Sequence, residues 1–105
     1  MKKITLKEFW NSKEKLAIHC NTEEKVNKLL KAFDKFGQKW ISGRSYLDDS
    51  HWDEIKDEIC YDNENIHGPY YVYEDDNYMI YEFDEVDLDN WLKTIYKLII
   101  MWYNI

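Results

Sequence analysis

The residues best suited to binding a metal ion are three histidines and two cysteines. Imidazole nitrogens and thiolates are the ligands that zinc prefers, and structural zinc sites repeat them at short spacings such as C-x-x-C. No two of these residues stand at such a spacing, and two of them are neighbours in a predicted strand, so their side chains point to opposite faces. We therefore expect no metal site and no cofactor. The five residues are His19, Cys20, His51, Cys60 and His67.

Other reaction chemistry also lacks a recognisable pattern. The segments "DNENIHG" and "DEVDLDN" carry carboxylates at alternate positions, but neither matches the twelve-residue calcium loop D-x-[DN]-x-[DN]-G-x5-E. No glycine-rich phosphate-binding motif is present, and the chain has only three glycines. A cysteine nucleophile would need a histidine beside it in the fold, which nothing local supports. The sequence predicts no catalytic residue and favours a protein that is not an enzyme.

The charges are divided unevenly along the chain, although the net charge is only −7. Residues 1–44 hold eleven basic and five acidic residues, a net charge of +6. Residues 45–90 hold sixteen acidic residues and one lysine, a net charge of −15, and residues 91–105 add two lysines. A field of this sign repels nucleic acid and attracts a basic partner. We expect no direct contact with nucleic acid and a basic protein as partner, although a solvated surface explains such charges equally well.

The acidic region also supplies two aromatic residues that are suited to an interface. Tyr46 and Trp52 are interleaved with the acids, and tyrosine and tryptophan are frequent at the energetic centre of protein interfaces. We predict that they anchor a partner while the acids contact its lysines and arginines. The predicted acids are Asp48, Asp49, Asp53, Glu54, Asp57, Glu58, Asp62, Glu64, Glu74, Asp75 and Asp76.

The first third of the chain shows clear signals for two helices and a strand. Thr5 and Glu8 have the spacing of a capping box, which predicts a short helix over residues 5–12. The alternating segment 15–20, "KLAIHC", is typical of a strand. Residues 21–37 form an amphipathic pattern that begins with Asn or Thr as N-cap and ends at a glycine, so they predict a helix from cap to cap.

The middle of the chain predicts short strands separated by loops. Residues 38–42, "QKWIS", and 58–62, "EICYD", are interpreted as strands, and 45–57 as a helical turn or an irregular loop. Residues 70–73 and 78–83 are rich in strand-forming aromatics and flank the polar turn "EDDN". They predict a β-hairpin. Tyrosines on both of its faces leave open a second interpretation, a platform for a ligand.

The last predicted helix, about residues 88–103, has an apolar arc that is wider than one small domain can cover. Either this helix lies deep in a groove or it meets a second copy of the chain in a homodimer. The residues predicted to face that second copy are Trp91, Ile95, Ile99 and Trp102.

Together the elements predict one domain over residues 1–105, with a core in 15–84. The expected class is α+β, a two-layer sandwich with a mostly antiparallel sheet, helices on one face and a C-terminal amphipathic helix. The chain shows no secretory signal and no apolar run of bilayer length. Two cysteines make no disulfide framework. We expect a protein of the cytoplasm with reduced thiols and no membrane contact.

One set of motifs carries a resemblance. The segments "AIHCNTEEKVNKLLKAFDKFGQKWISG", "CYDN" and "YMIYEF", within residues 15–84, resemble short open reading frames in phages and prophages of low-GC Gram-positive bacteria. That class has no agreed activity and supplies no catalytic residue to transfer. The resemblance implies a phage accessory protein, and small proteins of that kind often bind and block a host protein, including immune effectors.

Two functions from different classes follow. In the first, the chain is a non-enzymatic inhibitor that binds a basic, nucleic-acid-binding surface of a host defence effector, such as a CRISPR nuclease, in the bacterial cytoplasm. In the second, it is a protein that binds a small molecule, for example a signalling nucleotide that it sequesters in an aromatic pocket. There, aromatic residues would stack on the base and a cation would hold the phosphate, the candidates being Tyr70, Tyr71, Tyr73, Trp40, Arg44 and Lys39.

Overall fold

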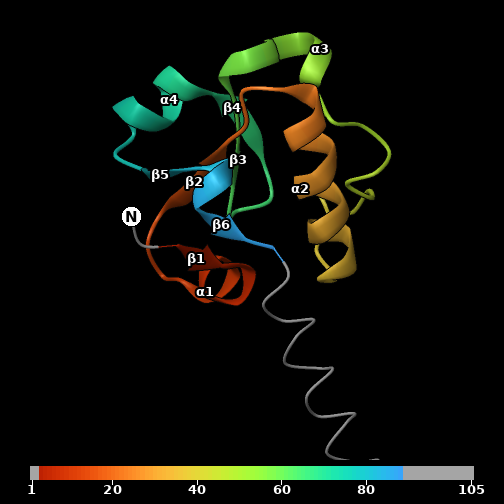
Figure 1. The fold of residues 1–105 in the computed structure, drawn as a ribbon, viewed down its shortest axis with the longest axis horizontal. Helices are drawn as coiled ribbons and strands as arrows, with labels where there is room; N and C mark the ends of the chain where they lie inside the picture. The colour runs from red at the N-terminus through yellow and green to blue at the C-terminus, as the bar shows by residue number, and fades with distance from the viewer. Residues whose placement is uncertain (1–2, 89–105) are drawn as a thin grey trace, which may run out of the picture.

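The computed structural model describes residues 3–88, which form an α+β fold with four α-helices and two β-sheets (Figure 1). The larger sheet has the strand order β4-β3-β2-β5. Its two pairs β4-β3 and β3-β2 are antiparallel, whereas β2 and β5 are parallel. The second sheet is a parallel pair of β1 and β6. The α+β class is confirmed, and the sheets are more mixed than expected. The helix predicted at about 88–103 lies outside the described residues.

The first elements follow the predicted signals closely. β1 (Ile4–Thr5) leads into α1 (Leu6–Asn11), and the capping box is present. The Glu8 backbone N–H donates to Thr5 Oγ1 at 3.1 Å, and the Thr5 N–H donates to Glu8 Oε1 at 3.1 Å. Val86–Asp87 form β6, which pairs with β1 and so joins the two ends of the described chain. The core therefore extends beyond the predicted 15–84 to residues such as Ile4 and Phe9.

β2 (Leu16–His19) and α2 (Glu23–Lys35) confirm the predicted strand and long helix. Of the two candidate caps, Thr22 fills the position, because its hydroxyl accepts from the Lys25 N–H at 3.2 Å. The helix ends in a Schellman motif around Gly37, whose φ of +90° suits glycine. The buried face of α2 carries the residues predicted for it, Val26, Leu29, Leu30 and Phe33.

The middle of the chain departs from the prediction in two places. Residues 38–42 form no strand; they belong to a turn in which Trp40 is buried and exchanges backbone bonds with the following loop. Residues 67–69, expected as loop, form β4 (His67–Pro69) against β3 (Ile59–Asp62). Residues 45–57, predicted as a helical turn or an irregular loop, contain α3 (Trp52–Ile55), which is followed by a 3-10 turn over Lys56–Glu58.

The predicted hairpin of residues 70–83 is wrong. Its first half is a helix, α4 (Tyr70–Asp75), and its second half is β5 (Met79–Glu82), which pairs in parallel with β2. The polar segment taken for a hairpin turn ends the helix: Asn77 has φ +62°, and the Tyr78 N–H donates to the Tyr73 carbonyl at 3.0 Å. Tertiary contacts outweigh the local strand preference of tyrosine and valine, because the helix buries Tyr73 against the sheet.

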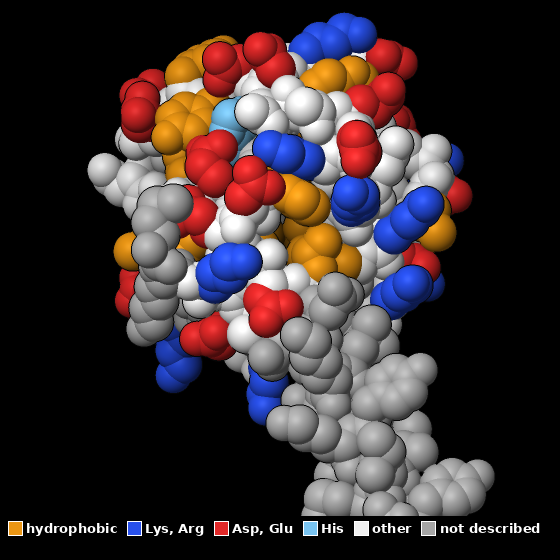
Figure 2. Space-filling view, viewed as in Figure 1, with side chains coloured by type: hydrophobic (Ala, Val, Ile, Leu, Met, Phe, Trp, Pro, Cys, Tyr) orange, Lys and Arg blue, Asp and Glu red, His pale blue; other side chains and the backbone are white. Residues whose placement is uncertain are grey.

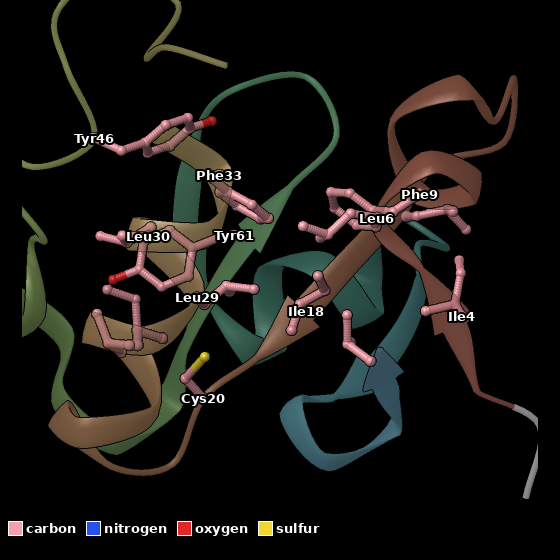
Figure 3. Packing of buried hydrophobic residues seen from close by; sticks show 14 of the residues in the cluster. Ile4, Leu6, Phe9, Ile18, Cys20, Leu29, Leu30, Phe33, Tyr46 and Tyr61 are labelled. Atoms are coloured by element: carbon pink, nitrogen blue, oxygen red, sulfur yellow. The ribbon is translucent and has the colours of Figure 1, made fainter. Parts of the chain in front are cut away.

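Helices cover both faces of the larger sheet, which corrects the predicted two-layer arrangement. On one face, residues such as Ile18 and Tyr61 pack against α2 and α1 in the main core (Figure 3). On the other face, their neighbours Ala17 and Cys60 pack against Tyr73 of α4. Figure 1 shows α2 and α4 on opposite sides of the sheet. The alternation of side chains along each strand sends neighbouring residues to the two cores.

Candidate protein-binding surface

The structure places ten of the eleven predicted acids at the surface and one inside. Asp62 is fully buried at the end of β3, so it is withdrawn from the predicted surface. Its Oδ1 accepts the N–H groups of Glu64 at 2.9 Å and Ile66 at 3.1 Å, and its Oδ2 accepts the Tyr73 hydroxyl at 2.7 Å. Burial raises the pKa of Asp62, and these hydrogen bonds oppose that rise. Asp62 ties the β3–β4 turn to α4.

The two predicted aromatic anchors also serve the interior. Tyr46 is 1% exposed, and its ring lies between Phe33 and Trp40, with centroid distances of 5.2 and 4.4 Å. Trp52 is half-buried and packs against the main core. Tyr46 cannot touch a partner in this fold, and Trp52 offers only part of its side chain. Aromatic residues in an acidic segment are equally typical of a loop that folds back on a core.

A different aromatic residue, Tyr70, lies among the acids. Three carboxylates from separate elements, those of Glu58, Glu74 and Glu82, act on its phenol. The pKa of Tyr70 is raised, first by burial and then by these charges, because all of them disfavour a phenolate. On its other side the ring meets the His19 imidazole edge-on, with centroids 5.1 Å apart. We call Tyr70 and these three glutamates the Tyr70 patch.

Several carboxylates at and beside this patch have no cation partner in residues 3–88. Asp57, Glu58, Glu74, Asp75 and Asp76 form no ion pair with a described lysine, arginine or histidine, although other exposed acids do. Figure 2 shows acidic side chains beside hydrophobic ones on the side of α4, whereas several lysine and arginine side chains line the side of α2. A carboxylate that has no cation partner within its own protein can pair with a lysine or arginine of another molecule.

Exposed apolar residues adjoin the same acids. Tyr71 is 65% exposed and Val72 38% exposed on α4, and Met79 is 57% exposed on β5. β5 also forms an edge of the larger sheet, so its outer side has no strand partner among residues 3–88. Exposed edges with apolar side chains are typical places for another chain to bind. The surface formed by α4, β5 and the Tyr70 patch therefore combines charge, apolar contact area and a strand edge that no strand of residues 3–88 covers.

The remaining predicted acids lie elsewhere or have partners. Asp48 lies 3.9 Å from Arg44, and Asp53 lies 3.2 Å from Lys56. The Tyr78 hydroxyl donates to Glu64 at 2.7 Å. Asp49 and Glu54 lie close to His51. The predicted single acidic surface is therefore divided into parts. The residues predicted for self-association, Trp91, Ile95, Ile99 and Trp102, lie outside the described residues.

The candidate nucleophiles are structural. Cys20 and Cys60 are free thiols and are fully buried. Burial raises the pKa of both, that of Cys60 to about 12, so neither supplies a thiolate near neutral pH. Both ring nitrogens of His19 lie 2.7 Å from an oxygen, of Glu82 on one side and of the Asp57 carbonyl on the other. The two cysteines pack in the interior, and His19 forms hydrogen bonds through both ring nitrogens.

The residues named for nucleotide stacking do not form one platform. Trp40 is 8% exposed, and Tyr46, His51 and His67 surround its ring. Tyr73 is 4% exposed beneath α4. Trp40 and Arg44 border one pocket, but none of the three hairpin tyrosines does. Within residues 3–88, the tyrosines named for stacking therefore lie outside the pocket that Trp40 and Arg44 border.

Comparison of the chain with family models, with curated proteins and with solved structures finds no match in any of the three. Within residues 3–88, no helix is both long and apolar enough to cross a membrane. Sequence reasoning missed Glu82 and Met79 as surface residues because it placed them in a hairpin. The charge of Glu82 is visible in the sequence, but its contact with His19 depends on β5 pairing with β2.

Proposed function

We propose that the protein binds a basic surface of another protein through α4, β5 and the Tyr70 patch. The observation that carries this proposal is a set of exposed carboxylates on and beside α4 that have no cation partner in residues 3–88. They lie next to Tyr70, whose ring contacts His19, and His19 in turn bonds to Glu82 and to the Asp57 carbonyl. Keeping like charges together costs free energy in the free protein, and a partner with lysines or arginines relieves that cost. The exposed tyrosine and methionine supply the apolar contacts that charge alone lacks.

The partner class follows from the sign of the surface. A protein groove that binds nucleic acid is lined with lysine and arginine, and an acidic protein competes for it by offering carboxylates in place of phosphates. The chain then acts as a non-enzymatic inhibitor. Together with the resemblance to phage accessory reading frames, this favours a bacterial defence effector such as a CRISPR nuclease as the target, met in the host cytoplasm.

The nucleotide-binding alternative has no comparable observation in its favour. Its stacking residues Trp40 and Tyr73 are buried, and its exposed tyrosine, Tyr71, does not border the pocket with Arg44. The surface proposal needs no rearrangement of the fold.

The experiment is affinity capture from lysate of a low-GC Gram-positive host at low and at high salt, followed by mass spectrometry. We expect a nucleic-acid-binding protein that is retained at low salt and released at high salt, because exposed charges more than about 10 Å apart are screened at 0.1 M salt. The captured protein is then purified, and its affinity for the chain and its nuclease activity are measured.

A matched pair of triple variants locates the contact. Glu58→Gln, Glu74→Gln, Asp75→Asn removes three carboxylates with no hydrogen-bond or ion-pair partner in residues 3–88. The control, Glu14→Gln, Glu23→Gln, Glu24→Gln, removes the same charge from exposed positions in the basic first part of the chain. We expect the first variant to lose binding and the control to keep it. Equal binding by both, or retention that is insensitive to salt, would rule the surface out.

A further inference from the structure

Two histidines and a glutamate meet beside Trp40, away from the thiols and from His19. His51 and His67 stack, with ring centroids 3.9 Å apart and an angle of 11° between the planes. Glu54 Oε2 lies 2.9 Å from His51 Nδ1 and 3.4 Å from His67 Nε2. Within the described chain, these three side chains place one donor atom each within 4.8 Å of the others. Both histidines border an open pocket of about 340 Å³.

The fold holds these residues together through bonds from three elements. His67 is the first residue of β4, and β4 pairs it with Tyr61 of β3. The Tyr61 hydroxyl donates to the Ser50 carbonyl, which fastens the chain just before His51. Trp40 Nε1 donates to the Asp49 carbonyl at 3.2 Å. The sheet therefore positions His67, and the hydrogen bonds to the Asp49 and Ser50 carbonyls position the loop that carries His51.

The backbone at His51 is held in an uncommon conformation. Its φ of 61° and ψ of 13° place it in the left-handed region, which residues other than glycine rarely adopt. Such a conformation is strained and persists only where surrounding contacts determine it. In this backbone conformation the His51 ring stacks on the ring of His67.

The charges of the three groups suit a cation. Metal ligation requires a neutral imidazole and an ionised carboxylate. The two imidazoles offer ring nitrogens, and Glu54, an exposed residue, offers carboxylate oxygens within reach of both.

We propose that His51 Nδ1, His67 Nε2 and the Glu54 carboxylate form a binding site for a divalent transition-metal ion, with Zn²⁺ as the best match. Two imidazoles and one carboxylate are a donor set that zinc accepts, with a fourth position left for water or another oxygen. Ligands about 2.0–2.1 Å from a tetrahedral ion lie ~3.3 Å apart, and the two distances to Glu54 fall on either side of that value.

Metal binding requires a rotation of the two rings and a fourth ligand. An imidazole binds a metal in its own ring plane, so nearly parallel stacked rings must rotate about χ2 to point at one ion. The His51 and His67 side chains are 24% and 22% exposed, and both border the pocket. Asp49 Oδ2 lies 3.6 Å from His51 Nδ1 and is the nearest candidate for the fourth ligand.

The test is a titration of Zn²⁺ into the full chain in competition with a chromophoric chelator. We expect one equivalent to bind, and His67→Asn to weaken binding by about tenfold or more. His51→Asn should do the same, and asparagine tolerates the left-handed backbone at that position. The matched control is His19→Asn, because His19 also pairs with a glutamate at 2.7 Å but has no second histidine beside it. This control should bind as the unmodified chain does.

A second measurement keeps the test independent of variant folding. Long-range 1H-15N NMR of the unmodified chain reports the side-chain nitrogens of all three histidines. We expect Zn²⁺ to shift the resonances of His51 Nδ1 and His67 Nε2 and to leave those of His19 unchanged. The proposal is overturned if Zn²⁺ shifts neither resonance, if the chelator keeps all the metal, or if His19→Asn weakens binding as much as His67→Asn.

Discussion

At the scale of single residues, Asp62 shows how this fold uses a buried charge. Its two carboxylate oxygens take three hydrogen bonds, from two backbone N–H groups and from Tyr73. A buried carboxylate is costly unless it is fully bonded, and here the bonds connect the β3–β4 turn to the second core. An acid that looked like part of an interface is therefore part of the scaffold.

The raised pKa of Asp62 predicts how stability depends on pH. The folded state holds the proton more tightly than the unfolded chain, whose carboxyl titrates near 3.8. The contribution of Asp62 to stability is therefore complete below that value and is lost as the pH rises through the folded pKa. In urea unfolding between pH 3.5 and pH 7, we expect the unmodified chain to lose stability relative to Asp62→Asn, which cannot titrate.

Asp62→Asn keeps an oxygen for the Glu64 and Ile66 N–H groups, so two of the three hydrogen bonds survive while the titration is removed. Its NH2 group faces the Tyr73 hydroxyl as a donor, and this change adds a constant offset at every pH. Asp62→Ala is the comparison, because it leaves buried donors without a partner at a cost of about 1–3 kcal/mol. A free energy of unfolding that differs between the unmodified chain and Asp62→Asn by the same amount at every pH would show that the pKa of Asp62 is not raised.

At the scale of elements, the two helices that flank the sheet end in the same way. In α2 the Gly37 N–H donates to Asp34 and the Gln38 N–H to Phe33; in α4 the corresponding donors are Asn77 and Tyr78. Both are Schellman motifs, with glycine in one and asparagine in the other at the left-handed position. The glycine of α2 predicts its motif from the sequence. The asparagine of α4 does not, because asparagine is common in helix ends and in hairpin turns alike.

This shared ending predicts the effect of substitutions at Asn77. Its φ of 62° disfavours a residue with an ordinary Cβ, so Asn77→Ala should cost about 1–2 kcal/mol. Asn77→Gly should leave the free energy of unfolding nearly unchanged or raise it, because glycine adopts this φ without strain. Chemical denaturation of both variants is the measurement. Equal stability of Asn77→Ala and Asn77→Gly would argue against a helix that ends at this residue.

At the scale of the whole molecule, the charge is divided between the first and the middle part of the chain. The first 44 residues have a net charge of +6 and residues 45–90 a net charge of −15. Two ion pairs join a base of the first part to an acid of the second, Lys25 to Asp84 and Arg44 to Asp48. They offset a small part of the acidic charge. Repulsion among the remaining acids opposes the compact state.

Salt should therefore stabilise the free protein while it weakens binding to a basic partner. Screening reduces repulsion among exposed carboxylates, so we expect the midpoint of urea unfolding to rise when NaCl is increased from about 0.01 to 0.3 M, as the Debye length falls from about 30 Å to below 10 Å. The triple variant at Glu58, Glu74 and Asp75 should show a smaller rise than the unmodified chain. A midpoint that falls with salt would mean that attractive ion pairs outweigh the repulsion.

The sequence by itself determined the elements whose signals are local. The capping box at Thr5, the strand at 16–19 and the capped amphipathic α2 depend on residues within a few positions of one another, so their patterns are readable without the fold. It did not determine the form of residues 70–75, because a helix there depends on Tyr73 reaching Ala17, Cys60 and Asp62. The same holds for both sites. Glu82 reaches His19, beside Tyr70, only because β5 pairs with β2, and His67 reaches His51 only because β4 pairs with β3. Strand pairing joins residues far apart in the chain, and no local pattern records which strands will pair.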